Sequence, residues 1–268
     1  MSSWQVRIAA AVLLLLAIIA GAAPLLAPED PTVINLEKQL LPPGGGHLLG
    51  TDTLGRCLFS RLLYGLRNSL LIASAVLGVR VFIGILVGIL STYSPGPVAL
   101  LFRRLIDLEL AFPGIVTPIV IVGMLGPGVV NLTLSLAVVG WSKYARLMGV
   151  RVASLKEKEF IEGARSYGAG DLHIILRHIL PNSIWTLAPL VSLGMGGLLI
   201  HIGGLSFLGL GLKPGTPELG MIIRDGYTVF PGMAHLVLLP SLLIFLVVLG
   251  MTVLSDWMRD VYDPRTRT

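Results

Sequence analysis

Charged, aromatic and sulfhydryl residues are scarce in this chain of 268 residues, of which 13% are charged and 7% aromatic. A typical soluble domain carries about 25% charged residues, so the composition excludes an ordinary water-soluble domain. The 20 basic residues outnumber the 15 acidic ones, but they are not clustered with aromatic platforms, which excludes a nucleic-acid-binding surface. Cys57 is the only cysteine, so an intrachain disulfide is impossible, and the sequence assigns the thiol no role.

The sequence also lacks the motifs of a catalytic or nucleotide-binding protein. It contains no G-x-x-x-x-G-K-[ST] phosphate loop, so we expect no ATP or Mg²⁺ bound to this chain. The histidines are scattered and offer no convergent set of acids, bases or ligands: His47, His173, His178, His201 and His235. We therefore expect a chain without catalytic residues and without a cofactor of its own.

Long apolar runs are what the chain has instead. Hydrophobic residues make up 54% of it, and the mean hydropathy is +0.84. A helix needs about 20 apolar residues to cross a hydrocarbon core. We therefore predict an all-α, polytopic membrane protein whose residues 1–268 form a single transmembrane domain. Its six predicted spans cover residues 6–26, 70–91, 105–125, 129–148, 184–205 and 236–254.

The first span resembles a signal peptide in one respect, because Gly21-Ala22-Ala23 has the small residues of a cleavage site. We favour an uncleaved anchor, since Pro24 would follow the cut and the apolar run continues through Leu26.

Lysine and arginine are distributed unevenly between the connecting segments. With a cytoplasmic N-terminus, the inner segments hold Arg7, Arg103, Arg104, Lys143, Arg146, Arg151, Lys156, Lys158, Arg165, Arg177, Arg259, Arg265 and Arg267, whereas the outer ones hold Lys38, Arg56, Arg61, Arg67, Lys213 and Arg224. Because basic residues collect on the cytoplasmic side, we predict that both termini and residues 149–182 lie inside. Residues 27–67 and 213–235 are predicted to be extracytoplasmic.

Several ionisable residues fall within or at the edge of the predicted spans. Arg80 lies inside the second span, where a cation is costly and usually faces protein or water. We favour a structural role for it, because nothing nearby in the sequence supplies a partner. Asp107 and Glu109, at the cytoplasmic end of the third span, are expected to pair with Arg103 and Arg104.

Small and helix-breaking residues predict how two of the spans pack. Gly84 and Gly88 form a small-xxx-small face in the second span, which lets another helix approach closely. Phe112-Pro113-Gly114 and Pro118 should kink the third span. Since freed backbone groups in a membrane need neighbours, we expect this span inside the bundle.

Residues 156–182 form the one long polar segment of the chain. Phe160, Ala164 and Tyr167 are spaced to share one face of a helix, and Gly168-Ala169-Gly170 should break it. Asp171 can cap a second helix over residues 172–180, which Pro181 should limit. Two short helices around a glycine elbow would offer an apolar face that suits docking into a groove of a partner.

The spacing of Glu162-Gly163-Ala164, Gly168 and Leu180-Pro181 resembles the loop of permease subunits of bacterial binding-protein-dependent ABC importers. That family's pattern is Glu-Ala-Ala, three residues, Gly, nine residues and Ile-x-Leu-Pro. This chain departs from the pattern at Gly163 and His178.

Three further stretches resemble the dipeptide, oligopeptide and nickel branch of that family. They are Gly50-Thr51-Asp52 through Arg67-Asn68-Ser69-Leu70, Gly203-Gly204-Leu205-Ser206-Phe207-Leu208-Gly209-Leu210-Gly211 with Pro217-Glu218, and Arg259-Asp260 through Asp263-Pro264-Arg265. Cys57 stands where the branch has Asp.

The resemblance implies the type I importer permease fold in a bacterial or archaeal cytoplasmic membrane. It also implies four kinds of partner: a second homologous permease, two cytoplasmic ATPase subunits that bind ATP and Mg²⁺, an extracytoplasmic solute-binding protein, and lipid. The ATPase-coupling residues it predicts are Phe160, Glu162, Gly163, Ala164, Tyr167, Gly168, Leu180 and Pro181.

The solute is left between two classes by the sequence. His201, with Met195 and Met221 as weak thioether ligands, favours nickel or a metal chelate, because imidazole suits Ni(II). The alternative is uptake of dipeptides or oligopeptides by the same mechanism. A secondary transporter or channel is less favoured, since we find no pair of repeated halves.

Overall fold

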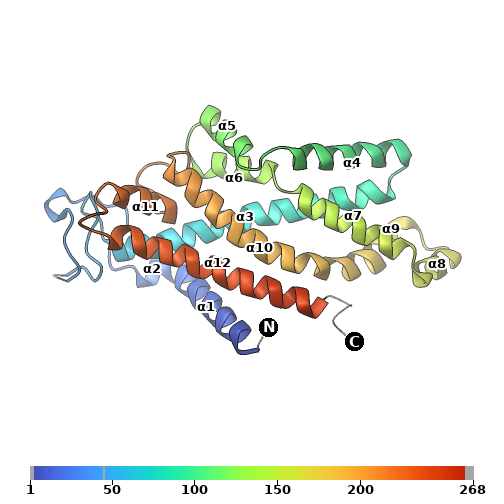
Figure 1. Cartoon of the computed structure of the whole chain (residues 1–268), viewed down its shortest axis with the longest axis horizontal. Coiled ribbons are helices and arrows are strands. Elements are labelled where there is room, and N and C mark those ends of the chain that lie inside the picture. The colour runs from blue at the N-terminus through green and yellow to red at the C-terminus, as the bar shows by residue number, and fades with distance from the viewer. Residues whose placement is uncertain (1–2, 45, 263–268) are drawn as a thin grey trace.

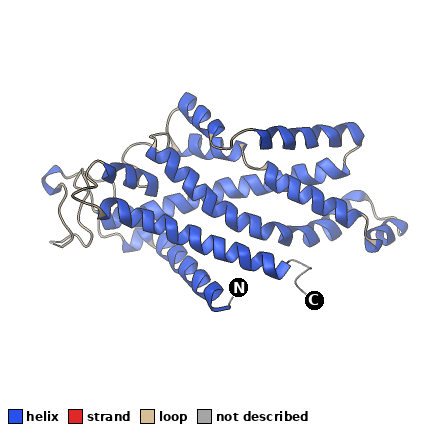
Figure 2. Cartoon of the chain, in the orientation of Figure 1, coloured by secondary structure: helices blue, strands red, loops and turns tan. Residues whose placement is uncertain are grey.

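The computed structural model describes residues 3–44 and 46–262, and every named element in this part of the chain is helical (Figures 1 and 2). The predicted all-α fold is thereby confirmed. The elements are α1 (Ser3–Gly21), α2 (Ala23–Leu26), η1 (Leu36–Lys38), α3 (Leu58–Tyr93), α4 (Gly96–Ala111), α5 (Val116–Leu125), α6 (Val129–Val138), α7 (Ser142–Lys156), α8 (Glu159–Ser166), α9 (Asp171–Ile174), η2 (Ile175–Ile179), α10 (Leu180–Phe207), α11 (Leu219–Tyr227) and α12 (His235–Tyr262). The end of the motif that begins at Arg259 lies outside the described residues.

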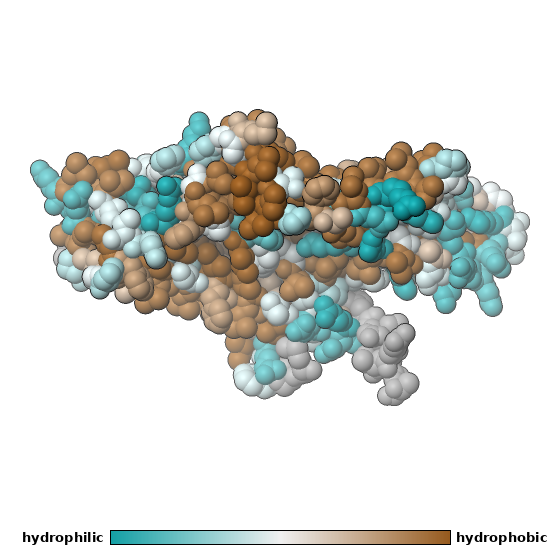
Figure 3. Space-filling view, turned by 45° about the horizontal axis from the view of Figure 1, so that its top comes forward, coloured by the Kyte–Doolittle hydropathy of each residue, from teal (hydrophilic) through white to brown (hydrophobic). Residues whose placement is uncertain are grey.

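The described helices form an elongated bundle (Figure 1). Residues 27–57 and α11 lie at one end of its long axis, and α8 and α9 lie at the other. Apolar side chains dominate the middle of the face in Figure 3, and hydrophilic ones gather toward the two ends. This distribution is what a bundle that crosses a bilayer requires.

Four helical stretches of the described part are long and apolar enough to cross a membrane: Trp4–Gly21, Leu58–Tyr93, Asp171–Phe207 and His235–Val261. The last three contain the predicted second, fifth and sixth spans. The first predicted span, residues 6–26, overlaps Trp4–Gly21 but extends beyond it into α2. The third predicted span is broken, because α4 and α5 meet at 86°. The fourth is also broken, at Gly140, where φ is +80° and α6 gives way to α7.

The third span does kink at Phe112-Pro113-Gly114, as predicted, but its expected position inside the bundle is wrong for this chain. Most apolar side chains of α4 and α5 are exposed, including Leu100, Leu101, Leu105, Leu108, Val120, Met124 and Leu125. The backbone at the break is satisfied locally instead, because Phe112 N–H donates to Glu109 at 3.3 Å and Val116 N–H to Pro113 at 3.0 Å.

Helix α3 packs closely on α7 through the predicted glycine face. A Cβ atom at Gly84 would lie 2.5 Å from the Tyr144 Cβ, and one at Gly88 would lie 2.7 Å from the Met148 Cβ. Side chains larger than hydrogen at these two positions would therefore push the helices apart. The main hydrophobic core lies between α3, α10 and α12 and includes Leu66, Ile72, Val76, Leu198, Leu199, Ile202 and Val247.

Candidate functional site

The glycine elbow forms where the sequence places it. Helix α8 ends at Ser166, and Gly168 follows with φ at +84°, a conformation that side-chain-bearing residues rarely adopt. Gly168 N–H donates to the Arg165 carbonyl at 2.9 Å, and Ala169 N–H donates to the Ala164 carbonyl at 3.1 Å. This pair of bonds is the Schellman motif, which ends a helix by satisfying its last carbonyl groups.

The helix after the elbow differs from the prediction. It does not stop near Pro181 but passes through one turn of α9 and the π-helical η2 into α10, which contains the fifth span. Pro181 lies in the first turn of α10, where proline is tolerated. Asp171 does not cap the helix as predicted, because the N-cap residue is Gly170. The Asp171 carboxylate instead accepts a hydrogen bond from Arg165 at 3.3 Å.

The inner side of the elbow is fixed to the bundle by a small apolar core. Ile161 of α8, Ile174 of α9 and Ile179 of η2 have no exposed surface. They pack with residues of α7 and α10, namely Met148, Val152, Leu155 and Leu187. A displacement of α8 and α9 is thereby passed directly to these two helices.

The outer side carries exposed apolar and aromatic side chains. Tyr167 is 95% exposed, Leu172 70%, Leu176 57% and Phe160 47%. We call these four residues the outer elbow face. The sequence predicted that Phe160, Ala164 and Tyr167 share one face. Ala164 is not part of the outer elbow face, because it is half-buried and packs on the inner core.

Imidazole rings extend the outer elbow face. The centroids of the Phe160 and His178 rings are 6.3 Å apart, and those of His173 and His178 are 5.9 Å apart. Sequence reasoning missed Leu172, Leu176 and these rings because it paired positions only within the first helix. Glu162 is exposed, and its carboxylate makes no hydrogen bond or ion pair with the described residues, although its backbone carbonyl accepts from the Ser166 hydroxyl at 3.0 Å.

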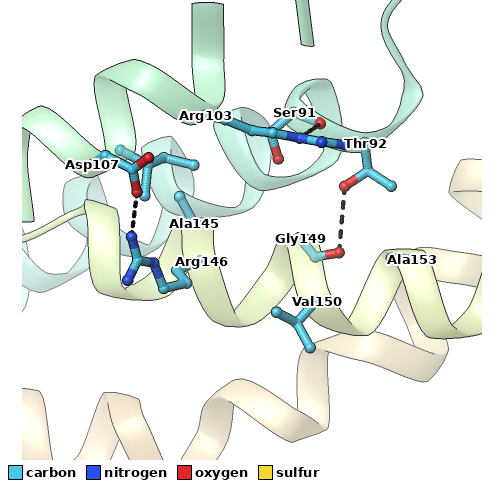
Figure 4. A pocket seen from close by; sticks show the side chains of 10 residues that line it. Ser91, Thr92, Arg103, Asp107, Ala145, Arg146, Gly149, Val150 and Ala153 are labelled. Carbon is cyan, nitrogen blue, oxygen red and sulfur yellow. Dashed lines mark hydrogen bonds and ion pairs between the residues drawn. The ribbon is translucent and has the colours of Figure 1, made fainter. Parts of the chain in front are cut away.

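A cavity of about 310 Å³ lies between the last turn of α3 and the middle turns of α4 and α7 (Figure 4). Asp107 forms an ion pair across it with Arg146, and the Thr92 hydroxyl donates to the Gly149 carbonyl at 3.3 Å. Nζ of Lys156, the last residue of α7, donates to the Thr92 carbonyl at 3.2 Å. These contacts connect the base of the elbow to α3 and α4.

The expected pairing of Asp107 and Glu109 with the neighbouring arginines of α4 is wrong. Asp107 pairs with α7, and Glu109 accepts a hydrogen bond from the backbone N–H of Gly140. Arg103 donates to the Ser91 carbonyl at 3.0 Å. Both acids thus join α4 to the α6–α7 region, which the spacing along one helix does not reveal.

A second cavity, of about 280 Å³, lies within the bundle and is lined by Arg80, Lys143 and His201. Arg80 is 5% exposed, and its Nε and Nη2 donate to the Leu136 carbonyl at 2.9 and 2.7 Å. A Cβ at Gly140 would lie 2.9 Å from the guanidinium carbon. Arg80 therefore has a partner distant in sequence, and it packs against the break between α6 and α7.

The three residues proposed for the translocation path are not brought together. Met195 is 9% exposed and faces different cavities from the one that His201 lines. Met221 is 4% exposed in α11. No joint ligand set forms from His201 and these two thioethers in the described structure.

At the opposite end of the bundle, Arg56 and Arg61 are almost fully buried in an ion-pair network. Nε of Arg56 lies 2.7 Å and Nε of Arg61 lies 3.3 Å from the Asp52 carboxylate. Both arginines also contact Asp225 of α11, at 2.8 and 3.1 Å. Both buried arginines are thereby neutralised by acids of this chain.

Glu218 caps α11 beside this network. Its carboxylate accepts hydrogen bonds from the backbone N–H groups of Gly220 and Met221 and from the Ser69 hydroxyl, each at 3.0 Å. These bonds hold α11 against α3, so the residues of the Pro217-Glu218 stretch serve to position this end of the bundle.

Comparisons with known proteins agree with this architecture. The family model described as "Binding-protein-dependent transport system inner membrane component" matches residues 81–268. The chain is 35% identical to the dipeptide transport system permease protein DppC of Haemophilus influenzae, over 95% of this chain and 88% of that one. It is 34% identical to the nickel transport system permease protein NikC of Escherichia coli K12, over 100% and 96%. It is 36% identical to the glutathione transport system permease protein GsiD of Pectobacterium atrosepticum, over 96% and 85%.

Solved structures share the fold at lower identity. An inward facing structure of the MetNI methionine ABC transporter superposes with a TM-score of 0.59 at 17% identity, covering 77% of this chain and 98% of that one. An amino acid ABC transporter crystallised with histidines gives a TM-score of 0.52, also at 17% identity, with 77% and 94% covered.

Proposed function

Because this chain belongs to the family of binding-protein-dependent transport system inner membrane components, in the dipeptide, oligopeptide and nickel branch of ABC-importer permeases, we propose that it forms half of a solute path. A second homologous permease supplies the other half. Two cytoplasmic ATPases drive the cycle, and an extracytoplasmic solute-binding protein delivers the solute. Both termini and residues 149–182 then lie in the cytoplasm, in keeping with the distribution of lysine and arginine.

The outer elbow face is the docking surface for an ATPase subunit in this proposal. It places apolar and aromatic side chains at a hydrophilic end of the bundle, away from the surface that lipid would cover. Exposed apolar patches of this kind mark interaction sites, and a helix that presents them suits a groove on a partner. The buried Ile161, Ile174 and Ile179 behind the face carry the proposal, because they join the docking surface rigidly to α7 and α10.

ATP-driven closure of the two ATPases would move α8 and α9 as one body. The motion reaches α10 through the continuous helix from η2, and it reaches α3 through Lys156 and the contacts around Thr92. Rigid-body movement of helices between two packed arrangements is a common form of such switching. Exposed Glu162 is free to pair with a basic group of the ATPase.

Co-purification tests the docking surface. A Tyr167→Ala/Leu172→Ala variant should lose the ATPase subunits. Phe82→Ala is the control and should retain them, because Phe82 is 70% exposed, as Leu172 is, but lies in the middle of α3, away from the elbow. Undiminished co-purification by the double variant would contradict the proposal. A secondary transporter or a channel would bring down no ATPase with any of the three chains.

The solute class in this proposal is a small molecule bearing a carboxylate, with di- or oligopeptides as first candidates. Arg80 and Lys143 line the cavity that also contains His201, and two cations attract an anion. The Glu109 carboxylate bonds the backbone N–H of Gly140, which packs against the Arg80 guanidinium, so it offsets part of this positive charge. Two cations beside one acid leave a net positive charge for a carboxylate.

Nickel or an anionic nickel chelate is the second candidate, supported by the imidazole of His201. Uptake of labelled dipeptide and of radioactive nickel by the reconstituted transporter separates the two classes. Nickel uptake that survives His201→Ala would remove the imidazole as a metal ligand, and dipeptide uptake that survives Arg80→Met would remove the carboxylate site.

A further inference from the structure

Three donor atoms meet in the segment before α3, at the end of the bundle opposite the elbow. The carboxylate of Glu29, the imidazole of His47 and the thiol of Cys57 place one ligand atom each within 4.8 Å of one another. Nδ1 of His47 lies 3.8 Å from Oε1 of Glu29. We propose that these side chains form a resident site for a divalent transition-metal ion, with Zn²⁺ as the best-matched occupant.

The burial of the donors points to a ligand. His47 is 5% exposed and Cys57 is 2% exposed. Nδ1 of His47 is buried and has no hydrogen-bond partner in the described part of the chain. Buried polar atoms are ordinarily hydrogen-bonded, and a metal ion that accepts the lone pair of this nitrogen gives it the missing partner.

Backbone contacts hold each ligand in place. His47 exchanges two backbone hydrogen bonds with Gly44, both at 3.0 Å, and Cys57 is the N-cap residue of α3. The backbone N–H of Glu29 donates to the Ser60 hydroxyl in the first turn of α3 at 3.2 Å. An ion bound here would tie residues 29–47 to the start of α3.

The geometry suits a tetrahedral ion after small side-chain rotations. Zinc bonds of about 2.3 Å to sulfur and about 2.0–2.1 Å to nitrogen and oxygen separate tetrahedral donors by about 3.3–3.6 Å. Donors that lie up to 4.8 Å apart therefore need to close by about 1.2–1.5 Å. A sulfur, nitrogen and oxygen donor set selects zinc over the oxygen-seeking Mg²⁺ and Ca²⁺, and the fourth position is left for water.

The charge around the site does not oppose a cation. The neighbouring network contains two cations, Arg56 and Arg61, and two anions, Asp52 and Asp225, so its net charge is zero. The Glu29 side chain is 46% exposed and leaves the ion a path from solvent. On binding, the thiol gives its proton to water and the thiolate sulfur bonds to the metal, so binding tightens as the pH rises.

Metal titration of the full chain tests the site, and the readout does not depend on transport. The protein is purified in detergent micelles through an affinity tag that contains no histidine, stripped with a chelator and titrated with Zn²⁺. We expect about one equivalent of bound ion per chain. Cys57→Ser and His47→Gln should each weaken binding by more than about 100-fold, because loss of an outer-shell partner alone costs about 10–100-fold. His235→Gln, at the start of α12 and outside both proposed sites, should bind Zn²⁺ as the wild type does.

Substitution with Co²⁺ gives a second test that needs no variant. A thiolate-to-cobalt charge-transfer band with the intense visible bands of a tetrahedral ion is expected in the wild type, and the charge-transfer band should vanish in Cys57→Ser. Absence of the band in the wild type, or Zn²⁺ binding by Cys57→Ser equal to that of the wild type, would overturn the proposal. Equal thermal unfolding of wild type and variant in chelator shows that both chains are folded.

Discussion

Replacement of Gly168 by valine tests whether the shape of the elbow is needed for coupling. The φ angle of Gly168 is +84°, and a Cβ atom at this position would meet no other atom within 4 Å. The cost of the substitution therefore comes from the backbone conformation alone. A residue with a side chain in such a conformation costs about 1–3 kcal/mol, and a β-branched one lies at the upper end. A free energy of this size lowers the population of the native elbow about 5- to 150-fold.

Gly163→Ala is the matched control. Gly163 lies within α8, five residues before the elbow, and a Cβ there also meets nothing within 4 Å. Alanine in a helix interior is about 0.5–1 kcal/mol more favourable than glycine. The same loop should thus be stabilised by one substitution and strained by the other.

The assay is solute uptake and ATP hydrolysis, measured together in proteoliposomes that contain the assembled transporter. Gly168→Val should hydrolyse ATP but lose uptake, since α8 and α9 no longer move as one body, while insertion into the membrane is retained. Gly163→Ala should keep both activities. If Gly168→Val transports as much solute per ATP as the wild type, the elbow conformation plays no part in coupling and the reasoning is refuted.

Three further predictions concern stability, each measured by unfolding in detergent micelles. Gly88→Val should overpack the α3–α7 contact and lower the free energy of unfolding by about 1–3 kcal/mol. Gly78→Ala should be neutral or stabilising, because a Cβ there meets nothing within 4 Å. Equal effects of the two variants would show that the close approach of α3 and α7 is unimportant. Asp52→Ala leaves the buried Arg56 and Arg61 short of a counter-ion and should lower the free energy of unfolding by about 3–5 kcal/mol. Asp107→Ala removes an ion pair whose partners are both 55% exposed and should cost about 1 kcal/mol or less. A larger loss of stability in Asp107→Ala than in Asp52→Ala would contradict the buried network. Glu218→Ala removes the cap of α11 and should cost about 2 kcal/mol, and an unchanged unfolding midpoint would count against that role.

Features that depend on neighbouring residues could be predicted from the sequence. Apolar runs long enough to cross a bilayer fix the positions of spans, because each residue contributes its own transfer free energy. Gly168 marks the elbow, since only glycine readily adopts the left-handed conformation that ends α8. Gly84 and Gly88 indicate a close helix contact because their spacing puts both on one face, although the identity of the partner, α7, was not accessible.

Features that depend on distant residues were decided by the tertiary structure. Arg80 bonds a carbonyl 56 residues away, and Arg61 contacts an acid 164 residues away, so no local pattern indicates either partner. The helix that continues through Pro181 follows the π turn before it and packs on the apolar core beneath it. Asp107 of α4 pairs with Arg146 of α7, and Glu109 accepts from Gly140 between α6 and α7. Hydropathy and glycine spacing thus determined which segments cross the membrane and where the elbow turns. Only packing determined which charges meet, which apolar side chains stay exposed at the elbow, and that Glu29, His47 and Cys57 converge, because such pairings follow from the positions of whole helices and loops in space.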